Sequence, residues 1–349
     1  MNHLCKNAGS LWSEFPLQRH VSIVKRFVFL LAIVTSVLGC GESGESEQLT
    51  IDLEHVSAIG DSDGVTFGDL HRMTSGDSGV LYVADGNRQL YALDRDGEML
   101  ARGGQRGPGP GEFESAPAAL ALHGDSLFVV ESSARTIHVF DSELNFVRRT
   151  PITVPGFTPR EIVSVDGGLY AGGLGGSAET RLVELTDDLN DYEPISLVGS
   201  HHDLAWDTFL LDASENALVV AYIFRNIVEV HPTDGQEPLS FSVEVANNLP
   251  DPPPIDESSV VSRDNMPSDP YIWSLTLDSE GRIYLLAYHF SNSPSKDVYV
   301  YSPDGTRLTT LTLTEPTERI YIDENDRLYA STKERTELSI YDMHFTETD

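Results

Sequence analysis

The sequence predicts an all-β protein, a six-bladed β-propeller whose ring is closed by an N-terminal strand. One pattern of short apolar strands, separated by turns rich in Asp and Gly, recurs six times in the 349 residues. Equivalent residues of the second strands are separated by 46, 42, 49, 65 and 45 residues; they are Tyr82, Phe128, Tyr170, Val219, Tyr284 and Tyr329. Periods of about 40–50 residues with four strands each are typical of propeller blades. No stretch of the sequence has sustained helical periodicity.

The second and third strands of each unit carry the strongest signal, because they are short runs of β-branched and aromatic residues. The second strands are expected at 80–84, 127–130, 169–171, 218–221, 283–287 and 328–331. The third strands are expected at 90–93, 137–140, 182–185, 227–230, 298–301 and 338–341. Asp and Gly stand between them because they tolerate the left-handed backbone of tight hairpins.

The sixth unit has predicted strands at 319–322, 328–331 and 338–341 and lacks a fourth. The segment 49–59 reads as a strand that belongs to no unit of its own. Pairing this segment with the last unit would close the ring and remove two free sheet edges. We therefore expect closure by the N-terminal strand.

Two segments resemble a known family. Residues 104–113 read GQRGPGPGEF and resemble the G-x-x-G-x-G-P-G-E-F connector of bacterial six-bladed propellers related to NHL repeats. Residues 85–91, DGNRQLY, resemble the NHL segment D-x-x-N-x-R-I, shortened by one or two residues. The resemblance covers most of residues 50–345. It implies the propeller fold and, because the family consists largely of binding and interaction proteins with a few enzymes, a binding role.

The N-terminal region predicts export. Residues 27–38 carry no charge and follow Lys25 and Arg26, as in a signal peptide, and they are too short to span a bilayer, which needs about 20 apolar residues. The next residues end in Gly39-Cys40 and resemble the bacterial lipobox, which implies a lipid on Cys40 and cleavage before it. The alternative is an ordinary signal followed by a chance cysteine. We expect a signal peptide at 1–39, a polar tether at 40–48 and a propeller at 49–349.

The charge balance limits the partners. The chain has 55 acidic and 23 basic residues, a net charge of −32, and the part after residue 39 carries 54 acidic and 19 basic residues. Such an acidic protein is a poor ligand for nucleic acid or an anionic membrane surface. Both cysteines, Cys5 and Cys40, precede the propeller. We expect a monomeric lipoprotein of the bacterial cell envelope, on the periplasmic side or the cell surface, that touches the membrane through its lipid only.

The two faces of the predicted propeller differ in their loops. Loops between second and third strands, and between blades, lie on one face, here called the long-loop face. The long segments assigned to it are 103–117, 151–159, 198–207, 247–271 and 288–297. The opposite face, here called the acidic-turn face, carries the tight Asp-rich turns. Since long loops in compact domains often carry function, the long-loop face is the expected binding surface for an envelope protein, peptide or glycan.

A basic residue stands just before each third strand on the long-loop face. These residues are Arg88, Arg135, Arg181, Arg225, Lys296 and Arg335. They have two interpretations: structural residues that hold each blade, with Asp85 and Glu131 as partners of Arg88 and Arg135, or a ring that attracts an anionic ligand.

The alternative function is a metal-dependent hydrolase or lyase, similar to propeller lactonases, with its site in the central channel. The candidate ligands on or near first strands are Asp69, His71, Glu161 and Asp207. Ca²⁺ would be the cofactor in that case only, and no other cofactor is expected. A site of this kind requires the four side chains to converge, and ion pairs with Arg72 or Arg160 would argue against it. The sequence contains no phosphate-binding loop of the P-loop type, and no cysteine lies within the predicted propeller, so it favours binding over catalysis.

Overall fold

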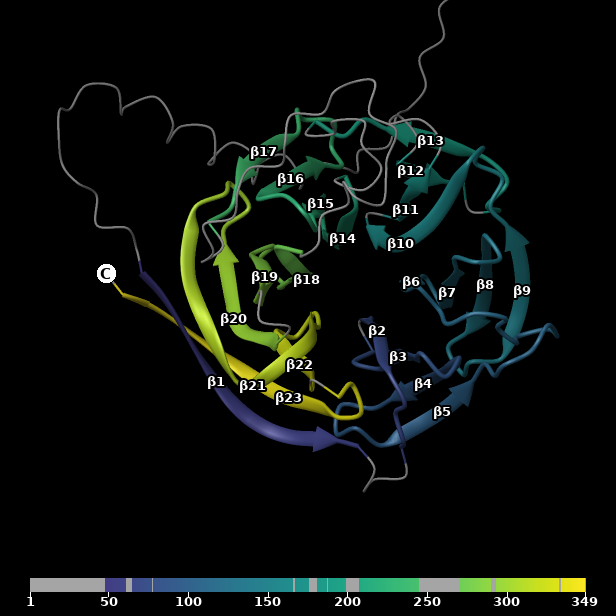
Figure 1. Ribbon diagram of the computed structural model, residues 1–349, viewed down its shortest axis with the longest axis horizontal. Helices are drawn as coiled ribbons and strands as arrows, with labels where there is room; N and C mark the ends of the chain where they lie inside the picture. The colour runs from purple at the N-terminus through teal and green to yellow at the C-terminus, as the bar shows by residue number, and fades with distance from the viewer. Residues whose placement is uncertain are drawn as a thin grey trace, which may run out of the picture. The chain divides into compact units, whose positions relative to one another are not determined.

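All the regular secondary structure that is described in the computed structural model is β-strand (Figure 1). The structure describes residues 48–60, 65–76, 78–165, 167–175, 181–186, 188–198, 207–244, 270–289, 293–332 and 334–348. The chain divides into two units, Met1–Ser46 and Glu47–Asp349, and the described residues belong to the second. The predicted signal peptide, Cys40 and almost all of the tether lie outside the described residues.

Four antiparallel sheets of four strands follow one another along the chain. The first contains β2 (Leu70–Ser75), β3 (Leu81–Asp85), β4 (Gln89–Leu93) and β5 (Met99–Gly103). The second contains β6 (Ala119–His123), β7 (Ser126–Glu131), β8 (Thr136–Asp141) and β9 (Phe146–Pro151). The third contains β10 (Phe157–Val165), β11 (Gly168–Gly175), β12 (Leu182–Leu185) and β13 (Tyr192–Ile195). The fourth contains β14 (Phe209–Ser214), β15 (Ala217–Tyr222), β16 (Ile227–Pro232) and β17 (Leu239–Ser242).

The fifth sheet has seven strands, in the order β1-β23-β22-β21-β20-β19-β18. Its strands are β1 (Gln48–Ile59), β18 (Ile272–Leu277), β19 (Ile283–His289), β20 (Ser293–Tyr301), β21 (Arg307–Ile322), β22 (Arg327–Thr332) and β23 (Leu338–Thr348). The beginning of β21 pairs with β20 and its end pairs with β22. We expected a separate strand at 319–322, and the structure instead continues the preceding strand into it. β1 pairs with β23, from Gln48 opposite Thr348 to Ile59 opposite Leu338.

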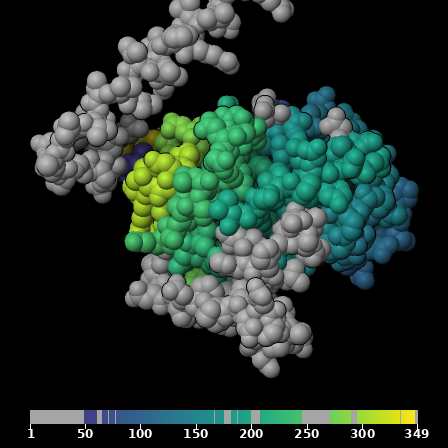
Figure 2. Space-filling model, turned by 90° about the horizontal axis from the view of Figure 1, so that it is seen from above, coloured from purple at the N-terminus to yellow at the C-terminus, as the bar shows by residue number. Residues whose placement is uncertain are grey.

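The sheets are arranged around a central axis, which confirms the predicted all-β propeller fold. In Figure 1, β2, β6, β10, β14 and β18 lie nearest the centre, and β5, β9, β13 and β17 lie at the rim. Figure 2 shows the propeller from the side, with the sheets following one another in chain order from blue through green to yellow. Among the described residues, no helix is long and apolar enough to cross a membrane.

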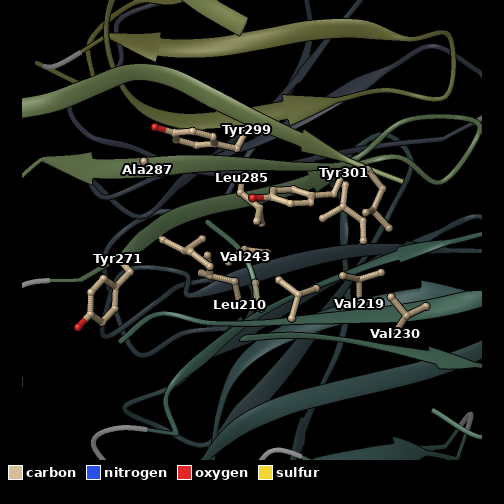
Figure 3. Close-up of a cluster of buried hydrophobic side chains, with 14 of the residues drawn as sticks. Leu210, Val219, Val230, Val243, Tyr271, Leu285, Ala287, Tyr299 and Tyr301 are labelled. Atoms are coloured by element: carbon tan, nitrogen blue, oxygen red, sulfur yellow. The ribbon is translucent and has the colours of Figure 1, made fainter. Parts of the chain in front are cut away.

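The hydrophobic core lies between neighbouring sheets. Figure 3 shows the cluster between the fourth sheet and the β18–β20 part of the fifth, where Val219 and Leu285 are 2% and 1% exposed. Another cluster packs Leu286 and Val298 of β19 and β20 against Ile320 and Leu328 of β21 and β22. The seven-stranded sheet therefore encloses a core of its own. Burying a Val, Leu or Ile side chain contributes about 1.5–3 kcal/mol, so such interfaces stabilise the ring without a disulfide.

The GQRGPGPGEF connector has a structural role between β5 and β6. Gly104 has φ +67°, and a side chain there would meet the ring of Phe113. Phe113 is fully buried against His138 and Phe140 of the next sheet. The Glu112 carboxylate accepts a hydrogen bond from the Gly109 N–H at 2.8 Å and so closes the loop. The motif that resembles NHL-related propellers thus joins two sheets.

The described loops differ in part from the expected long loops. Segment 288–297 is mostly strand, because β19 and β20 leave only residues 290–292 between them. Segment 151–159 includes the end of β9 and the start of β10. Most of 198–207 and 247–271 lies outside the described residues. The segment 103–117 is the long loop that the structure describes as expected.

Candidate functional site

The central channel contains a cavity of about 210 Å³. Its wall is formed by β2, β6, β10, β14, β18 and the end of β21, and each of these strands contacts the next around the ring. A second cavity of about 370 Å³ lies toward the acidic-turn face and shares Asp212 and Tyr321 with the first. The channel therefore has one end on each face, and the two ends carry different charged groups.

Arg72, Glu161 and Arg319 lie in the channel wall toward the long-loop face, and we call them the arginine end. Arg72 Nη2 and Glu161 Oε1 form an ion pair at 2.7 Å, and Arg72 Nε donates to the Ala118 carbonyl at 2.6 Å. Burial raises the pKa of Glu161, and the positive charges of Arg72 and Arg319 oppose this shift. This ion pair thus joins β2 to β10 across the channel wall.

Arg319 is held by contacts other than an ion pair. Its Nη1 donates a hydrogen bond to the Trp273 carbonyl, and its guanidinium lies 5.1 Å from the centre of the Trp273 ring. The Trp273 indole packs on Tyr288 at 5.2 Å and donates to Glu318 at 2.9 Å. Burial and the positive charge of Arg72 lower the pKa of Arg319 to about 9, so the group stays protonated at neutral pH. Within the described part of the chain, Arg319 has no carboxylate partner.

Arg335, one of the six predicted basic residues, lies beside this end of the channel. It forms ion pairs with Asp69 at 3.1 Å and with Glu318 at 3.2 Å. Asp69, predicted as a channel ligand, is therefore bound by an arginine. The structure brings Asp69 and Glu161 to the same end of the channel, but each is bound by a different guanidinium.

Asp207 holds two of the predicted basic residues together. Its carboxylate is fully buried and contacts Arg181 at 2.8 Å and Arg225 at 3.1 Å. Both guanidiniums are also buried, and that of Arg225 lies 5.0 Å from the centre of the Tyr222 ring. The repeat placed no acid next to these arginines, because Asp207 lies just before β14, the first strand of the sheet that follows Arg181, and 18 residues before Arg225. This cluster lies inside the protein and links two sheets.

The other three basic residues differ from one another. Arg135 donates to the Val154 carbonyl at 2.8 Å, and Lys296 donates to the Thr314 carbonyl at 2.5 Å. Arg88 is half-buried and has no side-chain partner among the described residues. Arg88, Arg135 and Arg335 all have positive φ, between 52° and 71°, although this backbone region favours Gly or Asn. Arginine at these positions is therefore not explained by backbone preference.

The two acids that we expected to pair with Arg88 and Arg135 bind elsewhere. Asp85 accepts hydrogen bonds from the N–H groups of Gly68, Asp69 and Asn87, so it fixes the loop before β2. Glu131 is paired with His138 at 3.1 Å and accepts the Ser115 N–H at 2.6 Å. Burial lowers the pKa of His138. Both acids satisfy groups inside their own blades.

The structure also bears on the alternative metal site. Of its four predicted ligands, Asp69, Glu161 and Asp207 each contact one or more arginines, and the His71 side chain lies outside the described residues. Residues 201–203, His-His-Asp, could also supply metal ligands, and they too lie outside the described residues. Within the described residues, no three His, Cys, Asp or Glu side chains are placed to hold a metal ion. The three described acids are therefore arranged as partners of guanidinium groups.

The opposite end of the channel is lined by carboxylates, and we call it the carboxylate end. The acidic residues lining its cavity are Asp212, Glu215, Asp278, Asp323 and Glu324. Burial raises the pKa of Asp212 to about 7, although the Ala213 and Leu277 N–H groups favour its charged form. Tyr321 forms hydrogen bonds at 2.7 Å with both the N–H and the hydroxyl of Ser75. No basic residue lines this cavity within the described part of the chain.

Our reading of the sequence did not select Arg319 or Trp273 as site residues. Both lie on strands of the channel wall, β21 and β18. Arg72 and Glu161 lie within β2 and β10, so a charged residue inside a channel-wall strand is a signal that could find such a site. For Arg319 the signal was hidden, because the residue was expected to start its strand.

Comparison with known proteins supports the fold. No family model matches the sequence, and no curated protein matches it. An exported protein of Bacteroides fragilis has a similar structure, with TM-score 0.58, 12% identity and coverage of 86% of this chain and 97% of that chain. The Cps50 (Swd1) β-propeller domain of Myceliophteria thermophila has TM-score 0.51 and 11% identity, with coverage of 83% and 99%.

A catalytically inactive virginiamycin B lyase from Staphylococcus aureus, solved with quinupristin, has TM-score 0.51 and 12% identity, with coverage of 84% of this chain and 99% of that chain. At such identities the likeness concerns the fold alone. The chain is similar in fold to a lyase, to an exported protein and to the Cps50 (Swd1) propeller domain, and these comparisons identify the fold as a β-propeller.

Proposed function

We propose that this protein is an exported, lipid-anchored binding or scaffold propeller, which engages an envelope protein, peptide or glycan through its long-loop face. The observation that carries this proposal is the use of charge at that face. Asp69, Glu161 and Asp207 are bound by arginines and are not free to hold a catalytic metal. Arg319 lies in the channel wall and forms no ion pair with a described carboxylate. Such a site is suited to receive a ligand.

The alternative, a metal-dependent hydrolase or lyase, needs those acids as ligands. Releasing Glu161 from Arg72 would leave a carboxylate in the channel beside a free guanidinium, at a cost of several kcal/mol. The fold similarity to a lyase does not favour this alternative, since propellers host many unrelated functions. The binding proposal therefore stands ahead of it.

A six-bladed count is part of the proposal. In this interpretation the seven-stranded sheet consists of two blades that share β21, and β1 supplies the outer strand of the sixth blade. Three features support it: six strands line the channel, each sheet-to-sheet contact has a hydrophobic cluster, and β21 changes partner along its length. The pairing of β1 with β23 would then close the ring.

The proposed lipid anchor has a direct test. Cells that express the wild-type chain and the Cys40→Ala variant are labelled with a palmitate analogue and fractionated. We expect label and membrane association for the wild type, and neither for the variant. Equal labelling of the two chains would contradict the anchor and leave an ordinary export signal as the explanation.

The binding face is tested with a photo-crosslinking amino acid. One variant carries it at Arg160, which is exposed beside the arginine end, and the control carries it at Asp96, which is exposed on the acidic-turn face. We expect illumination of intact envelopes to yield a discrete crosslinked species from position 160 and none from position 96. Crosslinking from position 96 alone would move the binding surface to the other face. No species from either position would contradict the binding function.

A further inference from the structure

We propose that the arginine end of the channel binds a carboxylate group of the ligand, and that Arg319 is the residue that receives it. This inference rests on the proposed binding function and specifies the chemistry of the ligand. It follows from the free hydrogen-bonding capacity of Arg319, the charges around it and the size of the cavity.

Arg319 has N–H groups to spare. A guanidinium carries five N–H donors. Arg319 uses Nη1 for the Trp273 carbonyl, and the described residues offer it no other hydrogen-bond partner. None of its nitrogens is among the fully buried polar atoms that lack a partner, and its side chain lines the channel cavity. The remaining N–H groups of Arg319 therefore face the space inside the channel.

The charges around Arg319 favour an anion. Arg72 and Arg335 are near enough for their positive charges to destabilise the charged form of Arg319, and the negative charges of Glu161 and Glu318 partly offset this effect. The acids nearby have other partners, since Glu161 is paired with Arg72 and Glu318 is paired with Arg335. A ligand anion would offset this repulsion where water is partly excluded and charge interactions are strong. Three arginines, Arg72, Arg319 and Arg335, meet three acids here, so this end of the channel is close to neutral in a chain with net charge −32.

The form of the site favours a carboxylate over a larger anion. The cavity of about 210 Å³ has room for the end of one side chain or of one peptide. A planar carboxylate matches the fork of a guanidinium, and its single negative charge matches the one unpaired arginine. The ring of Trp273, packed on Tyr288, provides an apolar surface next to the charge. The carboxylate has two sources in a peptide partner, the C-terminus or a Glu or Asp side chain.

The test uses three pools of random hexapeptides passed over the immobilised exported chain. The first pool has free C-termini and no acidic side chains, the second is the same pool with amidated C-termini, and the third is amidated with one fixed Glu. We expect the first or the third pool to be retained about 10- to 100-fold better than the second, the range for a hydrogen-bonded charge pair. The pool that is retained identifies the source of the carboxylate.

Variants assign the effect to Arg319. Arg319→Gln should reduce retention to that of the amidated pool, and Arg319→Lys should retain part of it. Arg160→Gln is the matched control, because it removes an exposed positive charge near the channel and should change retention little. Thermal melting of each variant verifies folding, and the comparison of pools on the wild type decides the question even if a variant is unstable.

The outcomes that overturn the inference are distinct from failure of the binding function. Equal retention of all three pools, retention of none, or retention that survives Arg319→Gln would each overturn it. A crosslinked partner at position 160 together with any of these results would leave the binding function standing and remove only the carboxylate site. Absence of a crosslinked species from both position 160 and position 96 would remove the binding function itself.

Discussion

The two faces of the propeller use charged side chains in different ways. On the long-loop face, ion pairs join residues far apart in the chain, such as Arg72 with Glu161 and Arg335 with Asp69. On the acidic-turn face, a carboxylate usually binds the backbone of its own turn. Asp141 accepts the N–H groups of residues two and four positions later. Asp278 and Asp323 repeat this arrangement.

The charged side chains of the two faces therefore have different structural roles. Carboxylates on the acidic-turn face fix the shape of hairpins and leave the surface strongly acidic. Arginines on the long-loop face connect neighbouring sheets near the channel, and Arg319 is left without an ion pair among the described residues. Since only 19 basic residues follow residue 39, their concentration there indicates where a negatively charged ligand would be attracted.

The largest effect is expected at Asp207. Asp207→Asn removes the charge that the buried guanidiniums of Arg181 and Arg225 both contact. Breaking a buried ion pair by removing one partner costs about 3–5 kcal/mol, so the free energy of unfolding should fall by that amount in urea denaturation. The control is Glu54→Gln, which removes an exposed ion pair with His344 and should leave stability almost unchanged. An equal loss in both variants would show that charge on this face does not connect the sheets.

A smaller effect on the free energy of unfolding is expected when a change of pH alters the protonation of Asp212. Its folded-state pKa of about 7 exceeds the ordinary value of 3.8, so the folded protein binds this proton more tightly than the unfolded chain. The resulting stabilisation is complete below about pH 4 and is lost as the pH rises through 7. Because the carboxyl faces the channel and is partly hydrated, we expect a loss of about 1–2 kcal/mol.

Asp212→Asn provides the check on this assignment. Unfolding free energies of the wild type and the variant are measured between pH 4 and pH 8. The difference between the two proteins should change across this interval, with the wild type losing more stability than the variant. Parallel curves would show that Asp212 has an ordinary pKa and that the carboxylate end does not differ in this way from the exposed turns.

The smallest effect is expected in an exposed turn. Asp141→Ala removes the hydrogen bonds that the carboxylate accepts from the Glu143 and Asn145 N–H groups. Since water replaces these partners in an exposed turn, the melting temperature should fall by less than in Asp207→Asn. Differential scanning calorimetry compares the two variants. A larger fall for Asp141→Ala would reverse the comparison between the faces.

The difference between local turns and long-range ion pairs also explains which features of the fold and the site could be predicted from the sequence. Turn residues act locally, so the Asp- and Gly-rich turns placed the second and third strands to within a few residues, as at β12 and β16. The continuous strand β21 was missed because its middle, TEPTE, contains Pro316 and reads as a turn. The positions of the six basic residues were predictable from the repeat. Their partners were not, since Asp207 and Glu318 belong to other elements.

The pairing of β1 with β23 also sets the order of folding. Of the described strands β1 is synthesised first and its partner β23 last, so their contact closes a loop of roughly 300 residues. By chain statistics such a closure costs about 5 kcal/mol, and it can happen only after the whole chain has been made. Until then β1 has an unpaired edge, and exposed residues such as Asp52 and Glu54 would protect it from wrong partners. The final folding step is therefore expected to be slow, and a chain interrupted before β23 should not complete it.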